Sequence, residues 1–372
     1  MNGTPDRDRP PGRRVLSAAL VLLALGALLL VGHELPRPVA PSEVPATVAT
    51  PPPPPPVPLD PAALAARVIP TIVTLEATAG PLTTAGTGIV IGDGLILTNH
   101  HVVDGATEVT ATAMATGTDH DTEILGYDRF RDVAVLRLLG ADPLPVAELG
   151  RSAGVRLRDP VTAIGNADGH GVPQSAPGIV TALGESVVAR NAADGTRNRL
   201  TGMIEVNADI RPGDSGGPLV DAFGRVVGVS TAGNTGMRPD PTERTTGTPI
   251  PVESYALPID DAVAIAEQIR TGRGSATVHI GPTPLLGVAV TDVGQTQGGA
   301  KVVAVGADSP ADRAGVVRGD VVISWDGRPI RSQTDLTVEM NGRHPGDRVE
   351  LGWTDGGGQP RTATIVLATG TP

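Results

Sequence analysis

Short apolar runs dominate the chain between residues 63 and 258. They are β-branched or alternate with polar residues, and Gly, Asp and Asn turns separate them, as between the runs at 88–91 and 95–98. Runs of this length and spacing predict antiparallel strands in a sandwich or barrel. Roughly 190 residues is generous for one small barrel and comfortable for two.

The pattern changes after residue 258. Residues 260–272 carry Ala, Ile and Val at helical spacing between an Asp and a Gly, which predicts a capped helix that closes this domain. Residues 280–370 combine strand-like runs with two helical stretches and predict a small mixed α/β module. We therefore expect a β-rich domain at 63–275 and a second domain at 280–370.

The N-terminal pattern is typical of a membrane segment. Val15 to Val31 is uncharged and almost wholly apolar, and it follows two arginines. At 1.5 Å per residue it reaches roughly 26 Å, slightly short of an apolar bilayer core of about 30 Å but longer than most signal-peptide apolar regions. No small-x-small cleavage site follows directly, so we expect an uncleaved transmembrane anchor at 15–32 in preference to a cleaved signal. The positive-inside rule then places residues 1–14 in the cytoplasm and the rest outside the cell membrane.

A proline-rich linker is expected over residues 33–62. Prolines occupy every position from 51 to 56, and proline fixes φ and lacks a backbone donor. We expect an extended polyproline II spacer that holds the next domain off the membrane. A ligand for an SH3 or WW domain is the alternative, which an extracytoplasmic position disfavours.

Composition narrows the function classes. The chain has 372 residues, no cysteine and a formal net charge of -11. Without cysteine it has no disulfide, no thiolate metal site and no cysteine nucleophile. It also lacks an extended Lys/Arg run, and phosphate neutralisation needs clustered positive charge, so we expect no nucleic-acid partner.

The most informative segment, residues 211–219, contains a serine flanked by glycines. A nucleophilic serine needs a tight turn and nearby backbone N–H groups aimed at the developing oxyanion, and glycines permit both. We expect Ser215 to be the nucleophile, with Gly213 and Ser215 supplying these N–H groups. The alternative is a glycine-rich hairpin loop without catalytic function.

Two adjacent histidines offer a base for this serine. His100 and His101 follow the apolar run at 95–98, where a rigid element can hold an imidazole, and position alone does not choose between them. Asp132 opens another apolar run, where a part-buried carboxylate can orient the ring. Taken singly, such an aspartate is more often a turn residue at the edge of a strand.

These three segments, in the order His, Asp, Ser, resemble the trypsin-like serine proteases, and specifically the HtrA (Deg) family. Residues 98–103 are similar to the family motif TNxHVV, which selects His101 as the base. Residues 132–136 are similar to its D-x-A-x-L strand, and residues 205–219 to its run ending in GNSGG. The resemblance implies a mostly β fold of two six-stranded barrels, with the His-Asp-Ser triad in the cleft between them.

The implied reaction is acyl transfer. Ser215 attacks a peptide carbonyl, His101 takes its proton and returns it to the leaving amine, and Asp132 holds the imidazole tautomer. No metal or cofactor is required. We therefore expect a serine endopeptidase that cleaves misfolded or regulatory proteins outside the cytoplasm.

The C-terminal module resembles a PDZ domain of the HtrA type. Leu285, Leu286, Gly287 and Val288 match the carboxylate-binding loop, whose N–H groups receive a peptide's C-terminus while the following strand pairs with it. The helix around Leu336 is expected to form the other wall of the groove. A purely structural module is the alternative.

Three features depart from the HtrA pattern. Asp214 stands where the family usually has Asn and so resembles the digestive trypsins, although no activation sequence is visible. Asp209 lies six residues before Ser215, where trypsin-like enzymes place the acid that selects Arg or Lys at the cleavage site, although a solvent-facing loop aspartate is the commoner outcome. Residues 33–80 lack the aromatic residues that HtrA trimers pack there, so the sequence leaves a homo-trimer open.

The rival function is a catalytically inactive PDZ chaperone or scaffold, which would bind misfolded proteins or peptide C-termini without cleaving them. The joint presence of His101, Asp132, Ser215 and Gly213 argues against it, because a pseudoprotease has no chemical need of all four. An esterase of another fold would need the order Ser-Asp-His and a strand-to-helix serine turn, which this sequence lacks.

Overall fold

The computed structural model describes residues 57–190, 197–231, 253–293 and 298–372. The predicted anchor at 15–32 and most of the predicted linker lie outside these ranges. Among the helices in the described ranges, none is both long and apolar enough to cross a membrane. All elements below belong to the unit Pro56–Pro372.

A capped helix comes first. Helix α1 (Pro61–Val68) is preceded by Asp60, whose carboxylate accepts hydrogen bonds from the N–H groups of Ala62 and Ala63. Proline at the first helical position needs no N–H partner, and the aspartate satisfies two free donors, so the local sequence encodes this start. One turn of 3₁₀ helix, η1 (Ile69–Thr71), then leads into the first strand.

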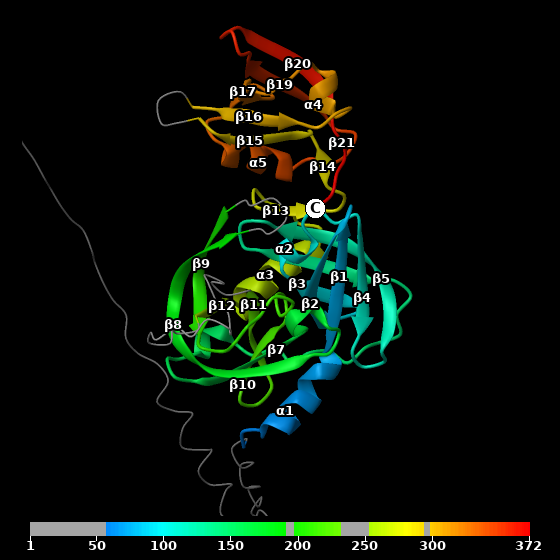
Figure 1. The fold of residues 1–372 in the computed structure, drawn as a ribbon, viewed down its shortest axis with the longest axis vertical. Coiled ribbons are helices and arrows are strands. Elements are labelled where there is room, and N and C mark those ends of the chain that lie inside the picture. The colour runs from blue at the N-terminus through cyan, green and yellow to red at the C-terminus, as the bar shows by residue number, and fades with distance from the viewer. Residues whose placement is uncertain (1–56, 191–196, 232–252, 294–297) are drawn as a thin grey trace, which may run out of the picture. The chain divides into compact units, whose positions relative to one another are not determined.

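Strands β1 to β6 form the first barrel (Figure 1). They are β1 (Ile72–Ala79), β2 (Leu82–Gly92), β3 (Leu95–Thr98), β4 (Glu108–Ala113), β5 (Thr118–Asp128) and β6 (Val133–Leu138). They pair in the order β5-β4-β1-β2-β3-β6, and β5 also pairs with β6, which closes the barrel. Strand β13 (Val278–Ile280) pairs with the last residues of β5, and the short helix α2 (His100–Val103) follows β3.

The second barrel is closed in the order β10-β11-β12-β9-β8-β7. Its strands are β7 (Pro160–Gly165), β8 (Gln174–Arg190), β9 (Arg197–Val206), β10 (Pro218–Asp221), β11 (Val226–Thr231) and β12 (Ser254–Pro258). The other elements are η2 (Ser152–Gly154), η3 (Ala167–Gly169) and α3 (Ile259–Arg270), the predicted closing helix. The predicted mostly β fold with two six-stranded barrels is confirmed.

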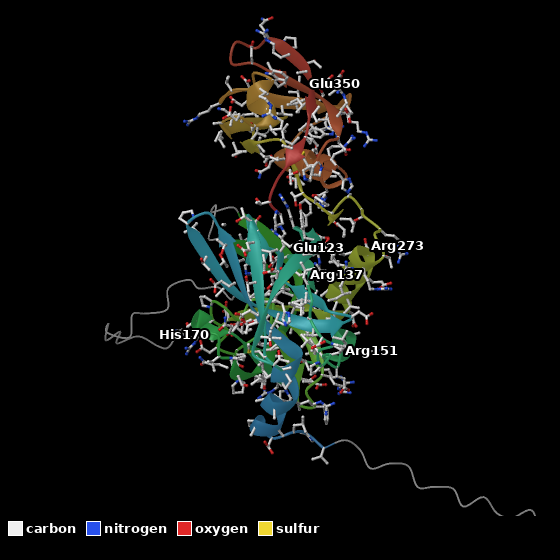
Figure 2. All side chains as sticks on the ribbon, turned by 90° about the vertical axis from the view of Figure 1, so that its right-hand side faces the viewer. Glu123, Arg137, Arg151, His170, Arg273 and Glu350 are labelled. Atoms are coloured by element: carbon white, nitrogen blue, oxygen red, sulfur yellow. The ribbon has the colours of Figure 1, made fainter. Side chains whose placement is uncertain are left out.

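The barrel cores consist largely of aliphatic side chains, as a chain with so few aromatic residues requires. The largest buried aliphatic side chains of the first barrel are Ile72, Leu75, Ile89, Ile96, Leu97 and Leu136, and Tyr127 is its largest buried aromatic residue. Burying each such side chain contributes about 1.5–3 kcal/mol to folding. On the exposed surface, Glu123 of β5 and Arg137 of β6 are cross-strand partners with 3.4 Å between their charged atoms (Figure 2). Exposed pairs of this kind add little stability, so the aliphatic core holds the barrel together.

The C-terminal domain is built on a six-stranded sheet. Its strands are β15 (Val288–Asp292), β16 (Ala300–Val305), β17 (Val321–Trp325), β18 (Arg328–Pro329), β19 (Arg348–Thr354) and β20 (Pro360–Val366). Helices α4 (Pro310–Arg313) and α5 (Gln333–Asn341) and the strand pair β14 (Pro284–Leu285) and β21 (Ala368–Thr369) complete it. Both tryptophans of the chain, Trp325 and Trp353, are buried in its core.

Candidate active site

His101 lies in helix α2 and makes two contacts with Asp132. Its backbone N–H donates to Oδ1 of Asp132 at 2.9 Å, and its ring Nδ1 lies 2.7 Å from Oδ2. Asp132 directly precedes β6 and has a φ of 57°, a left-handed conformation that aspartate adopts more readily than most residues. One carboxylate therefore fixes both the backbone and the ring of His101.

Two further side chains secure Asp132, which is buried. The amide group of Asn99 donates to its backbone carbonyl at 2.8 Å, and the hydroxyl of Thr231, at the end of β11, donates to Oδ2 at 3.3 Å. Burial by itself would raise the pKa of Asp132, but the charge and hydrogen bonds of His101 outweigh it, and the pKa is lowered. Burial would likewise lower the pKa of His101, but the charge and hydrogen bond of Asp132 raise it.

His100 has a different environment from its neighbour. Its ring packs against Tyr127 with 4.8 Å between the ring centroids, and only 8% of its side chain is exposed, against 31% for His101. Burial, with the charge of Arg129, lowers the pKa of His100 to about 3. His100 is thus a neutral, packed histidine, and the geometry favours His101 as the base.

Ser215 is buried in a tight turn that precedes β10. The next residue, Gly216, has a φ of 84°, and a β-carbon there would lie 2.1 Å from the hydroxyl oxygen of Thr98. Only glycine fits this conformation and this approach. The turn that carries Ser215 therefore packs against the end of β3, directly before the segment that contains His101.

The peptide between Pro212 and Gly213 has a defined orientation. The Pro212 carbonyl accepts a hydrogen bond from the N–H of Asp168 at 2.7 Å, and Gly213 has a φ of 96°. In a trans peptide the N–H lies opposite the carbonyl, so the N–H of Gly213 is directed away from Asp168. A β-carbon at position 213 would lie 2.1 Å from the carbonyl oxygen of Asn166, which excludes any other residue from this turn.

Asp214 is buried beside Ser215. Its Oδ2 accepts a hydrogen bond from the N–H of Arg211 at 2.9 Å, whereas Oδ1 has no hydrogen-bond partner among the described residues. Burial raises the pKa of Asp214 to about 6, the bond from Arg211 opposes this rise, and the charge of Asp168 adds to it. This carboxyl group therefore holds its proton to a higher pH than an ordinary aspartate does.

Asp209, the candidate for selecting a basic residue, is paired with Arg211. The guanidinium donates to Oδ2 of Asp209 from Nε at 3.0 Å and from Nη2 at 2.8 Å, and to Asp168 from Nη1 at 3.1 Å. The hydrogen bonds that Arg211 donates to Asp209 and Asp168 raise its pKa. A cation of the protein itself thus already balances the charge of Asp209.

The predicted carboxylate-binding loop connects β14 with β15. Leu286 is buried, Leu285 is 39% exposed, and Gly287 has a φ of 87° with no room for a β-carbon beside Ser309. Val288 begins β15, which lies at the end of the strand order and pairs with β16 alone within the described sheet. An edge strand of this kind can accept a further strand.

The helix around Leu336, expected as the other wall of the groove, is α5, which packs against β15 and β16. The side chain of Leu336 is buried in the core of the C-terminal domain with Trp325 and Trp353. Leu336 therefore holds α5 to the sheet, and a wall beside β15 would have to be formed by other residues of that helix.

Several residues that hold the site were not singled out in the sequence. Thr98 and Asn99 belong to the motif that selects His101, so the motif contains a signal for them. Thr87 lies between two glycines on β2, and Thr231 ends β11; nothing local distinguishes them from other strand threonines. Across the described ranges, no group of three or more His, Asp or Glu side chains is placed to hold a metal ion.

Comparisons with known proteins identify two domains and several relatives. A trypsin-like peptidase domain matches residues 86–229, and a PDZ domain matches residues 284–366. The chain is 34% identical over 381 residues to the serine protease PepD of Mycobacterium tuberculosis, which covers 97% of this chain and 79% of PepD. It is also 34% identical to a probable periplasmic serine endoprotease DegP-like of Pseudomonas savastanoi, over 75% of this chain and 55% of that protein. A solved HtrA-type protease, AlgW with a tripeptide, matches with 25% identity and a TM-score of 0.46 over 84% of this chain and 97% of AlgW.

Proposed function

The chain belongs to the HtrA (DegP) family of trypsin-like serine proteases with a PDZ domain, and from this premise we propose that His101, Asp132 and Ser215 are its catalytic triad. As a member of this family the chain is a serine endopeptidase. The observation that carries the triad proposal is the double contact of Asp132 with the backbone and ring of His101, at 2.9 and 2.7 Å. This contact distinguishes His101 from the packed His100 beside it.

The mechanism follows from the states of these groups. The Oγ of Ser215 attacks the substrate carbonyl and transfers its proton to Nε2 of His101, and the lowered pKa of Asp132 keeps a negative charge beside the imidazolium that forms. The N–H groups of Gly213 and Ser215 stabilise the negative oxygen of the tetrahedral intermediate, and each such donor is worth on the order of 10²–10³ in kcat. His101 then protonates the leaving amine, and water hydrolyses the acyl-enzyme by the same steps.

The proposal also covers how substrates bind and where the protease is located. Protein segments bind the PDZ domain, and we assign their C-terminal carboxylate to the loop at 285–288 and their backbone to the open edge of β15. We place the protease outside the cytoplasm, tethered by residues 15–32, where it cleaves misfolded or regulatory proteins. Deletion of residues 1–32 should then release active enzyme from the membrane fraction, and a full-length chain that stays soluble would contradict the anchor.

Labelling with a fluorophosphonate tests the triad. Wild-type protein should be labelled at Ser215, whereas Ser215→Ala should lose labelling and reduce kcat by on the order of 10⁶ while it unfolds at the wild-type temperature. Ser186→Ala, which makes the same change at an exposed serine on β8, is the matched control and should label normally. Undiminished turnover by Ser215→Ala would remove Ser215 from the mechanism, and an unlabelled wild type would favour the inactive scaffold.

A further inference from the structure

One buried threonine contacts both the serine turn and the strand end that leads into His101. Thr87 lies on β2 of the first barrel and is fully buried. Its N–H donates to the carbonyl of Ser215 at 2.9 Å, and its hydroxyl donates to the carbonyl of Gly213 at 2.7 Å. Its own carbonyl accepts a hydrogen bond from the hydroxyl of Thr98 at 2.7 Å. Thr87 therefore joins the serine turn to the strand end that leads into His101.

The hydroxyl of Thr87 is used both as a donor and as an acceptor. It accepts a hydrogen bond from the N–H of Asn166 at 2.9 Å, directly after β7, while it donates to Gly213. An apolar side chain would leave a buried N–H and a buried carbonyl without this partner, and each such loss is costly. The chemical requirement at position 87 is thus a hydroxyl.

Packing around Thr87 leaves no room for adjustment. A β-carbon at Gly165 would lie 3.0 Å from the Thr87 hydroxyl oxygen, and one at Gly217 would lie 3.2 Å from its methyl carbon. At Gly216 a β-carbon would lie 2.2 Å from the Thr87 carbonyl oxygen. Because two glycines pack this closely against the side chain of Thr87 and a third against its carbonyl, a displacement of Thr87 would displace the serine turn.

We propose that Thr87 is a positioning residue that sets the two oxyanion-binding N–H groups relative to His101. It holds the carbonyls of Gly213 and Ser215, the residues on either side of Asp214, and these same two residues supply the proposed donors. Both bonds come from the first barrel, which also carries His101, so Thr87 fixes one half of the site against the other. The inference rests on the proposed triad and deepens it.

The kinetic test uses two matched pairs of variants. Thr87→Val removes the hydroxyl at constant shape, and Thr87→Ser keeps it. Thr87→Val should lower kcat by on the order of 10²-fold with KM changed far less, because misplaced donors lose contact mainly in the transition state. Thr87→Ser should stay near the wild-type kcat. If Thr87→Val does not fold, Thr87→Ala can be compared with Thr87→Ser. This pair also differs by the hydroxyl, and both side chains are smaller than threonine.

A second measurement separates positioning from stability. The affinity for a peptide boronate, which mimics the tetrahedral intermediate, should fall in Thr87→Val in proportion to kcat/KM. Binding of uncleaved peptide to Ser215→Ala should not change when Thr87→Val is added. Thr74→Val, at the buried cross-strand partner of Thr87 on β1, is the control and should keep wild-type kcat.

Each outcome decides a different point. If the wild type is labelled by the fluorophosphonate and folded Thr87→Val reacts equally fast, Thr87 has no positioning role and the triad stands. If the Val and Ser variants, or the Ala and Ser variants, lose kcat to the same extent, the hydroxyl is not responsible and the inference fails. A wild type that neither reacts nor cleaves contradicts the proposed function itself.

Discussion

Two buried aspartates, one in each barrel, adjoin His101 and Ser215 respectively and differ in their surroundings. Asp132 in the first barrel and Asp214 in the second are 5% and 3% exposed. The carboxylate of Asp132 receives hydrogen bonds from the N–H and ring of His101 and from the hydroxyl of Thr231. The carboxylate of Asp214 receives a backbone bond from Arg211, and its Oδ1 lacks a partner among the described residues.

Burial acts on both acids, but only at Asp132 do the charge and hydrogen bonds of a neighbour, His101, outweigh it. Burial disfavours the ionised form of both acids, yet the pKa of Asp132 is lowered while that of Asp214 is raised to about 6. Asp132 pairs with His101, which no other acid named here shares. In the second barrel, Asp209 and Asp168 share the single guanidinium of Arg211. The surroundings of Asp132 favour its ionised form, whereas those of Asp214 favour its protonated form.

Asp132→Asn removes the charge that the first region maintains and should have the largest effect among changes to these two aspartates and their partners. The amide cannot stabilise the imidazolium or enforce the required tautomer, so kcat should fall by on the order of 10⁴-fold. Steady-state cleavage of a peptide substrate measures this loss. Asp128→Asn changes another buried aspartate, which accepts bonds from Phe130 and Arg131, and should lower stability more than kcat. Equal kcat losses in the two variants would contradict a specific role for Asp132.

The pH dependence of the same enzymes sharpens this point. Proton transfer from Ser215 requires neutral His101, and Asp132 raises the pKa of His101 above its usual 6.5. Wild-type kcat/KM should therefore fall as the pH drops through a midpoint above 6.5. Asp132→Asn should move this midpoint to lower pH, because the neutral amide no longer favours the imidazolium. A midpoint that does not move would show that another group titrates.

The sequence and the structure agree best where one motif contains several interacting groups. The segment of Thr98, Asn99 and His101 could be recognised because it resembles one family motif. The alternating runs predicted a sandwich or barrel, and the resemblance supplied the two barrels. Thr87 could not be recognised as part of the site. Its partners lie 79 and 126 residues away in sequence, and only the closed barrels bring them together. Long-range hydrogen bonds of this kind leave no periodic signal in the chain.

The partners of the two acids near Ser215, Asp209 and Asp214, could not be predicted from the sequence for the same reason. The spacing of Asp209 from Ser215 suggested a pocket for a basic residue, but the pairing of Asp209 with Arg211 depends on how the loop folds. The raised pKa of Asp214 depends on its burial. The sequence shows that Asp stands where the family usually has Asn, but it does not show that this residue is buried. Sequence identified these acids, and the structure supplied their partners.

Asp214→Asn should change how stability depends on pH. Because the pKa of Asp214 rises from 3.8 to about 6 on folding, the folded chain holds this proton more firmly than the unfolded chain. Wild-type stability should therefore fall as the pH rises from about 4 to above 6. At pH above this range Asp214→Asn should be more stable than the wild type by about 1–3 kcal/mol, and the gain should vanish at low pH.

Urea unfolding of both proteins across this pH range tests the prediction. Glu123→Gln makes the corresponding change at an exposed acid and should follow the wild-type curve. An Asp214→Asn variant that differs from the wild type by the same amount at every pH would show that Asp214 does not titrate in this interval. Asp214 would then stay ionised across this range, as Asp132 does, although it receives fewer hydrogen bonds.

Arg211→Ala tests the shared cation of the second region and should have the smallest effect. Truncation removes the guanidinium from Asp209 but keeps the backbone N–H that bonds Asp214. If Asp209 faces the bound substrate, loss of the Arg211 counter-charge should raise kcat/KM for cleavage after Arg, relative to cleavage after Val, by about tenfold or less. Adding Asp209→Ser should cancel the change, because the attracting charge is then gone. An unchanged ratio in Arg211→Ala would mean that Asp209 stabilises the loop and does not select the substrate. Asp214 would then be the acid that distinguishes this region from the one around Asp132.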